Sequence, residues 1–130
     1  MSTDKSEHEL LAEALGRLGT RLSACCADAG REMSSADAMA SALSRHITGL
    51  KPNELPTAAR TIWADRVARP LKASAHKPLS QRSIAMVRSW PSARVEQLAA
   101  ALAAIAEAVE EAEIDARNEI VRAAISREYS

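Results

Sequence analysis

Neither glycine nor proline occurs in the chain after Pro91. These two residues most readily interrupt a helix, because glycine is too flexible and proline lacks a backbone donor. We therefore expect one helix of up to about 37 residues from Ser92 to Glu128, about 55 Å long at 1.5 Å per residue. A compact chain of 130 residues has a radius of gyration of only about 14 Å, so this helix would overhang its own fold unless it breaks or packs along another subunit.

The first part of this long helix carries apolar residues at heptad spacing, alternately three and four positions apart. They are Val95, Leu98, Leu102, Ile105, Val109, Ala112 and Ala116. A sustained heptad repeat is typical of a coiled coil, which two chains or two segments of one chain can form. We expect the interface of a homo-oligomer, such as a homodimer, at the first five positions: Val95, Leu98, Leu102, Ile105 and Val109.

The composition favours helix along the whole chain. Alanine, the strongest helix former, occurs 28 times and glycine only four times, and the only aromatic residues are Trp63, Trp90 and Tyr129. The sequence therefore predicts an all-α fold, a helical bundle of about five helices with a long C-terminal helix. Both tryptophans occur among apolar residues at helical spacing, so we interpret them as hydrophobic anchors rather than as platforms for stacking bases.

Local signals indicate an antiparallel hairpin of two helices in the first fifty residues. The apolar face of the first helix comprises Leu11, Leu15, Leu18, Leu22, Cys25 and Ala29. Gly30 offers an end to this helix, Ser34 or Ser35 is a suitable N-cap for the next one, and Gly49 would end the second.

Proline and serine punctuate the middle of the chain. Pro56 is suited to the first turn of a third helix, which contains Trp63 and Arg66 and should end before Pro70. A loop without apolar periodicity follows, and Ser80 is a good N-cap for a short fourth helix over residues 81–90.

The charges add up to zero, with 17 basic and 17 acidic side chains, but they are segregated along the chain. Residues 1–50 carry −2, residues 51–94 carry +7 from nine basic and two acidic side chains, and residues 95–130 carry −5. Segregated charges create local potentials that the total conceals. We expect a single all-helical domain over residues 1–130, composed of an acidic helical hairpin (1–50), a basic helix-loop-helix segment (51–91) and a long acidic helix (92–130).

The basic segment has the residue types that a nucleic-acid-binding surface needs, namely cations for the phosphates and short polar side chains at the start of a helix. The candidate nucleic-acid-binding residues are Lys72, Lys77, Ser80, Gln81, Arg82, Arg88 and Arg94. These residues predict a small non-catalytic regulator that binds nucleic acid through residues 51–94.

Two other functions remain open at this stage. The first is a protein-protein interaction adaptor or structural bundle, whose basic segment packs on its own acidic helices or on an acidic protein partner. The second is a ligand-binding bundle, which would need an apolar cavity near Trp63 or Trp90.

Catalytic, metal and cofactor chemistry finds no support in the sequence. The three histidines lie far apart, no nucleophile or phosphate-loop motif occurs, and we expect neither enzyme activity nor a metal or cofactor. Cys25 and Cys26 are adjacent, so we expect reduced thiols, with Cys25 buried and Arg21 the only local group able to lower its pKa. No apolar stretch is long enough for a membrane span or forms a secretory signal, which favours a cytoplasmic location and no membrane partner.

Overall fold

The computed structural model describes residues 6–30 and 35–129, and over these residues the chain is all-α. Its α-helices are α1 (Glu7–Gly30), α2 (Ala36–His46), α3 (Thr57–Ile62), α4 (Gln81–Met86) and α5 (Ser92–Tyr129). Short segments extend or link them: the 3₁₀ turn η1 (Pro52–Glu54), the π-helical η2 (Trp63–Ala68) and the 3₁₀ turn η3 (Val87–Ser89). The predicted helical bundle with a long C-terminal helix is confirmed.

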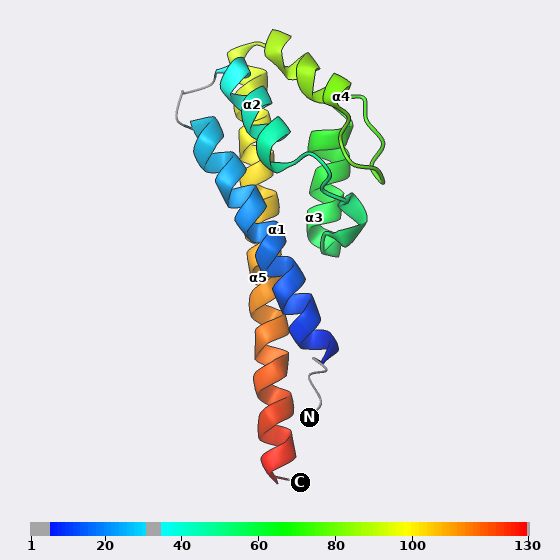
Figure 1. Cartoon of the computed structure of the whole chain (residues 1–130), viewed down its shortest axis with the longest axis vertical. Coiled ribbons are helices and arrows are strands. Elements are labelled where there is room, and N and C mark those ends of the chain that lie inside the picture. The colour runs from blue at the N-terminus through cyan, green and yellow to red at the C-terminus, as the bar shows by residue number, and fades with distance from the viewer. Residues whose placement is uncertain (1–5, 31–34, 130) are drawn as a thin grey trace.

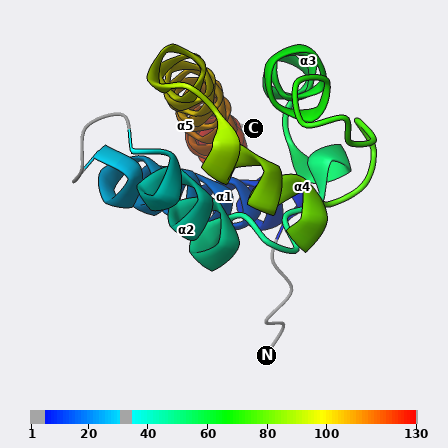
Figure 2. The same cartoon turned by 90° about the horizontal axis from the view of Figure 1, so that it is seen from above.

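The helices form a long stalk with a wider end (Figure 1). In the stalk, α1 and α5 run antiparallel and share the most extensive contact between two elements of the fold. The segment 36–91, which we call the head, gathers α2, α3 and α4 around the first half of α5, as the view along the stalk shows (Figure 2). At 38 residues α5 is far longer than the 24-residue α1, and its C-terminal part continues beyond the start of α1.

The heptad residues of α5 form the core of a single chain. Val95, Leu98, Leu102, Ile105 and Val109 are at most 2% exposed, because α1, α2, α3 and η2 all pack on this helix. The predicted interface between copies at these five positions is therefore wrong: the repeat is satisfied within the chain, and its side chains are not available to a second copy. A heptad specifies that a helix face is covered, not which helix covers it.

The stalk helices approach each other closely at two glycines of α1. A Cβ atom placed on Gly16 would lie 3.3 Å from Oε2 of Glu113, and one on Gly19 would lie 3.8 Å from Cγ1 of Val109. Leu15, Leu18, Leu22 and Cys25 are buried as predicted, but Leu11 is 49% exposed, and Ala12 is buried instead.

Side-chain caps fix the ends of the head helices. Ser35 Oγ accepts a hydrogen bond from the amide of Ala38, which confirms Ser35 as the N-cap of α2, whereas Ser34 lies outside the described residues. Beyond α2 the backbone turns at Gly49, whose φ of +82° suits glycine. Arg21 of α1 donates to the carbonyls of His46 and Thr48, both at 2.9 Å, and so satisfies acceptors left over at the end of α2.

The third helix differs from the expectation in its second half. It starts at Thr57, directly after Pro56, and from Trp63 it continues as a π-helix, in which the amide of Arg69 reaches back five residues to the carbonyl of Ala64 at 3.2 Å. The predicted fourth helix is α-helical only to Met86 and ends in η3. None of the described helices has the combination of length and apolar composition that crossing a bilayer requires.

Candidate nucleic-acid interface

All nine basic side chains of residues 51–94 are exposed. They are Lys51, Arg60, Arg66, Arg69, Lys72, Lys77, Arg82, Arg88 and Arg94. The two carboxylates of this segment, Glu54 and Asp65, are exposed as well. The +7 of this segment therefore lies on the surface, almost all of it on the head, at the opposite end of the molecule from the C-terminal part of α5.

The acidic residues between Glu107 and Glu119 of α5 form no ion pair with this basic surface among the described residues. Glu113 pairs with Arg117 at 2.8 Å and Glu119 with Arg122 at 2.7 Å, both within α5. No ion pair given by the described residues joins a cation of residues 51–94 to a carboxylate between Glu107 and Glu119.

The cations of the head that do have an acidic neighbour form surface pairs. Arg69 lies 3.5 Å from Asp65 and Arg88 lies 3.3 Å from Asp37, with all four side chains more than half exposed. Pairs of this kind contribute only about 0–1 kcal/mol and open easily when a stronger anion approaches.

Two of the predicted binding residues hold the head together instead. Ser80 Oγ caps α4 by accepting a hydrogen bond from the amide of Ser83 at 3.1 Å. Gln81 is tied to the end of α2: its Oε1 accepts from Ser44 Oγ at 3.4 Å and its Nε2 donates to Thr48 Oγ1 at 3.3 Å. Both side chains therefore have hydrogen-bond partners within the head, and the contact with nucleic acid predicted for them loses support.

Three of the predicted cations are free. Lys72 and Lys77 belong to the loop between η2 and α4, and Arg82 belongs to the first turn of α4. Each is exposed, and none of the three side chains forms a hydrogen bond or ion pair with another described residue. The loop and the first turn of α4 therefore carry three exposed cations whose side chains form no ion pair with a described residue.

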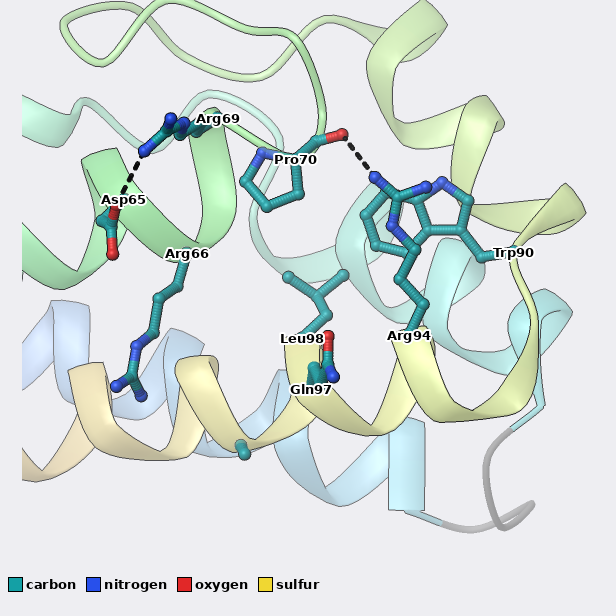
Figure 3. Close-up of a pocket in the computed structure, with 9 residues that line it drawn as sticks. Asp65, Arg66, Arg69, Pro70, Trp90, Arg94, Gln97 and Leu98 are labelled. Atoms are coloured by element: carbon teal, nitrogen blue, oxygen red, sulfur yellow. Dashed lines mark hydrogen bonds and ion pairs between the residues drawn. The ribbon is translucent and has the colours of Figure 1, made fainter.

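Arg94, the last predicted cation, lines a cleft of about 620 Å³ between η2 and the first turns of α5. Its guanidinium stacks on the Trp90 ring, 4.4 Å from the centroid, and donates to the carbonyl of Pro70 at 3.5 Å. Figure 3 shows this stack, with Arg69 turned toward Asp65 and Arg66 extending from η2 toward α5. The remaining lining residues are Gln97, Leu98 and Ala100.

This cleft adds two arginines that the sequence-based candidates lacked. The sequence-based candidates include neither Arg66 nor Arg69, yet both are exposed and line the cleft with Arg94. The local excess of basic residues was the only sequence signal for Arg66 and Arg69. The π-helical turn that carries Arg66 has no recognisable sequence pattern. A ligand-binding bundle would need a cavity near a tryptophan, and this cleft beside Trp90 is such a cavity. Its rim carries three arginines and one carboxylate, so the cleft is a concave part of the basic surface.

Trp63 and Trp90 are hydrophobic anchors, as predicted. Trp63 is fully buried and Trp90 is 9% exposed, with Arg94 against its ring. Neither ring face is open to a base. The described residues contain no group of three or more His, Cys, Asp and Glu side chains placed to hold a metal ion.

The cysteines do not form a reactive pair. Both are free, Cys25 is fully buried, and Arg21 points to the end of α2 rather than activating a thiol. Burial raises the pKa of the Cys25 thiol to about 12, with smaller contributions from Cys26 and Asp28. A thiol with this pKa stays protonated at neutral pH and is a poor nucleophile.

The raised pKa of Cys25 predicts a loss of stability in alkali. The unfolded thiol ionises near pH 9, whereas the folded thiol does not, so the unfolded state releases the proton first. The free energy of unfolding should be unaffected by this group below pH 9 and should fall between pH 9 and 12, by up to about 1.4 kcal/mol per pH unit. Urea unfolding from pH 8 to 10.5 measures it, and Cys25→Ala should remove this part of the slope. Equal slopes for the two proteins would contradict the assignment.

Comparison with models of known protein families, with curated proteins and with solved structures found no match to this chain.

Proposed function

We propose that the protein is a small non-catalytic regulator that binds nucleic acid through the basic surface of residues 51–94. The observation that supports this most directly is the exposure of all nine basic side chains, against two carboxylates in the same segment. A concentrated positive surface attracts the phosphate backbone and gains free energy when the bound counterions of the nucleic acid are released.

The hydrogen bonds within the head favour binding to the phosphate backbone over recognition of a base sequence. The helix that would enter a groove, α4, is only six residues long, and Ser80 and Gln81 at its start are engaged within the protein. Lys72, Lys77 and Arg82 have no such engagement and suit phosphate contacts. The proposal therefore assigns affinity to these cations and little base preference to α4.

The acidic stalk sets the orientation of the complex. Residues 95–130 carry −5, and a polyanion repels them while it attracts the head. The head should face the nucleic acid with the C-terminal part of α5 pointing away. The proposal also keeps the cytoplasmic setting, to which two free thiols are suited.

A salt titration tests the proposed function. Electrophoretic mobility shift or filter binding with a generic DNA duplex should give binding at low salt, and log affinity should fall linearly with log salt concentration. With three to six phosphate contacts the slope should be on the order of −3 to −5. No binding at low salt, or an affinity that ignores salt, would contradict the proposal.

An acidic protein partner is the competing occupant of the same surface. Poly-glutamate carries dense negative charge without phosphate groups, so it serves as the matched competitor. We expect duplex DNA to displace poly-glutamate at a lower concentration of charge than the reverse experiment requires. A preference for poly-glutamate would favour the adaptor function instead.

A further inference from the structure

The C-terminal part of α5 carries a second apolar row on the side that faces away from α1. Ile114, Val121 and Ile125 are about half exposed, at 51%, 55% and 49%. At about 100° per residue, they lie about 120–160° around the helix axis from Val109, which is buried in the stalk. This row is therefore separate from the heptad residues that α1 covers.

The row has heptad spacing when the polar residue Asn118 is included. Ile114, Asn118, Val121 and Ile125 follow at intervals of four, three and four, and Asn118 is exposed like its neighbours. Two core positions per seven residues, with a single asparagine among aliphatic residues, are typical of a short coiled-coil seam between chains.

We propose that this row is the contact between two copies of the chain, which pair antiparallel through residues 111–128 of α5. In this arrangement Ile114 of one copy packs on Ile125 of the other, and Val121 packs beside Asn118. A two-fold axis near residues 119 and 120 repeats each contact, so one surface is used twice and the assembly closes as a dimer.

The charges beside the row favour the antiparallel direction. Asp115 and Arg122 occupy equivalent flanking positions seven residues apart, and antiparallel pairing places Asp115 of each copy beside Arg122 of the other. Parallel pairing would instead place Arg117 beside Arg122 and Glu110 beside Asp115, which are like charges. Asp115 is exposed and forms no ion pair with a described residue, and among the described residues Arg122 forms an ion pair only with Glu119 of its own helix.

The small size of the row limits the expected affinity between the two copies. About two heptads of one helix per copy bury less than the roughly 1,200 Å² of a standard interface, so the dimer should be weak, with a Kd on the order of 10–100 μM. The two heads would lie at opposite ends of the dimer, with the first residues of the two α5 helices about 80 Å apart along the paired helices. The inference stands independently of what the heads bind.

Sedimentation equilibrium of the full chain from 1 μM to 1 mM tests the proposal. The molar mass should rise from 13.9 kDa toward twice that value, and Val121→Asp should weaken association at least about 20-fold. Ser126→Asp, which adds the same charge on another side of α5, is the control and should change the Kd less than threefold. A wild-type chain that stays monomeric at 1 mM, or a Val121→Asp variant that dimerises normally, would overturn the proposal.

A charge swap tests the direction of pairing. Asp115→Arg and Arg122→Asp should each weaken the dimer about 5- to 10-fold, because each places like charges together twice. The double variant should return to within about threefold of the wild-type Kd. A merely structural role of these two residues would give additive losses, and absence of rescue would exclude the antiparallel contact. Thermal unfolding at 1 μM verifies that each monomer is folded.

Discussion

Replacing Trp63 by alanine is expected to lower the free energy of unfolding by about 3–5 kcal/mol. Trp63 heads the set of large side chains that are fully buried. It is the first residue of η2, a segment that packs on α5. Removing its ring would leave a cavity between the head and the stalk that the neighbouring helices cannot readily fill. Since small proteins are stable by only about 5–15 kcal/mol, urea unfolding should show a large fall in the midpoint concentration.

Trp63→Phe is the matched control for this prediction. The indole Nε1 of Trp63 is buried without a hydrogen-bond partner among the described residues, and a buried donor of this kind costs free energy. Phenylalanine removes the unsatisfied donor together with part of the volume, so the two effects oppose each other. We expect less than half the loss caused by alanine. A phenylalanine variant as unstable as the alanine variant would show that Nε1 is satisfied in solution.

The ends of the helices were predictable because capping chemistry is local. Ser35 and Ser80 accept hydrogen bonds from amides three residues further along the chain, and Gly49 adopts a backbone conformation that suits glycine. The length of α5 was predictable for the same reason, since nothing after Pro91 interrupts a helix. Neither inference depended on how the helices pack.

The packing partners were not predictable from spacing. The heptad of α5 indicated a covered face, and the structure shows that α1 and the head cover it within one chain. The stripe of α1 was extended to Leu11, which is 49% exposed, whereas the adjacent Ala12 is buried. The π-helical turn of η2 arises where Trp63 is buried, and it has no sequence signature that distinguishes it from an α-helix.

The candidate site likewise combines a feature that the sequence predicts with features that depend on the tertiary structure. Charge is additive along the sequence, so the +7 of residues 51–94 and its segregation from the acidic helix could be calculated in advance. Hydrogen bonds of individual side chains depend on tertiary neighbours, so the engagement of Gln81 by Ser44 and Thr48 of the α2 region could not. The sequence therefore located the basic surface but did not reveal the hydrogen bonds that Ser80 and Gln81 form within the head.

Reversing two free cations of the head should weaken nucleic-acid binding strongly. Lys77→Glu/Arg82→Glu changes the net charge by −4 at positions that are exposed and form no ion pair with a described residue, so the fold should be unaffected. We expect a 10- to 100-fold loss of affinity for duplex DNA at about 0.1 M salt, and a salt slope that is smaller in magnitude by about 2, because two phosphate contacts become repulsive.

The control for this variant carries the same change of charge on the stalk. Arg17 of α1 and Arg127 of α5 are both exposed and lie outside the head. Charges on the surface are screened beyond roughly 10 Å at 0.1 M salt, so Arg17→Glu/Arg127→Glu should change the affinity less than about threefold. Equal losses in the two variants would show that net charge alone governs binding, and the head would then lose its assignment as the binding surface. A loss confined to Lys77→Glu/Arg82→Glu would place the phosphate contacts on the loop before α4 and on its first turn.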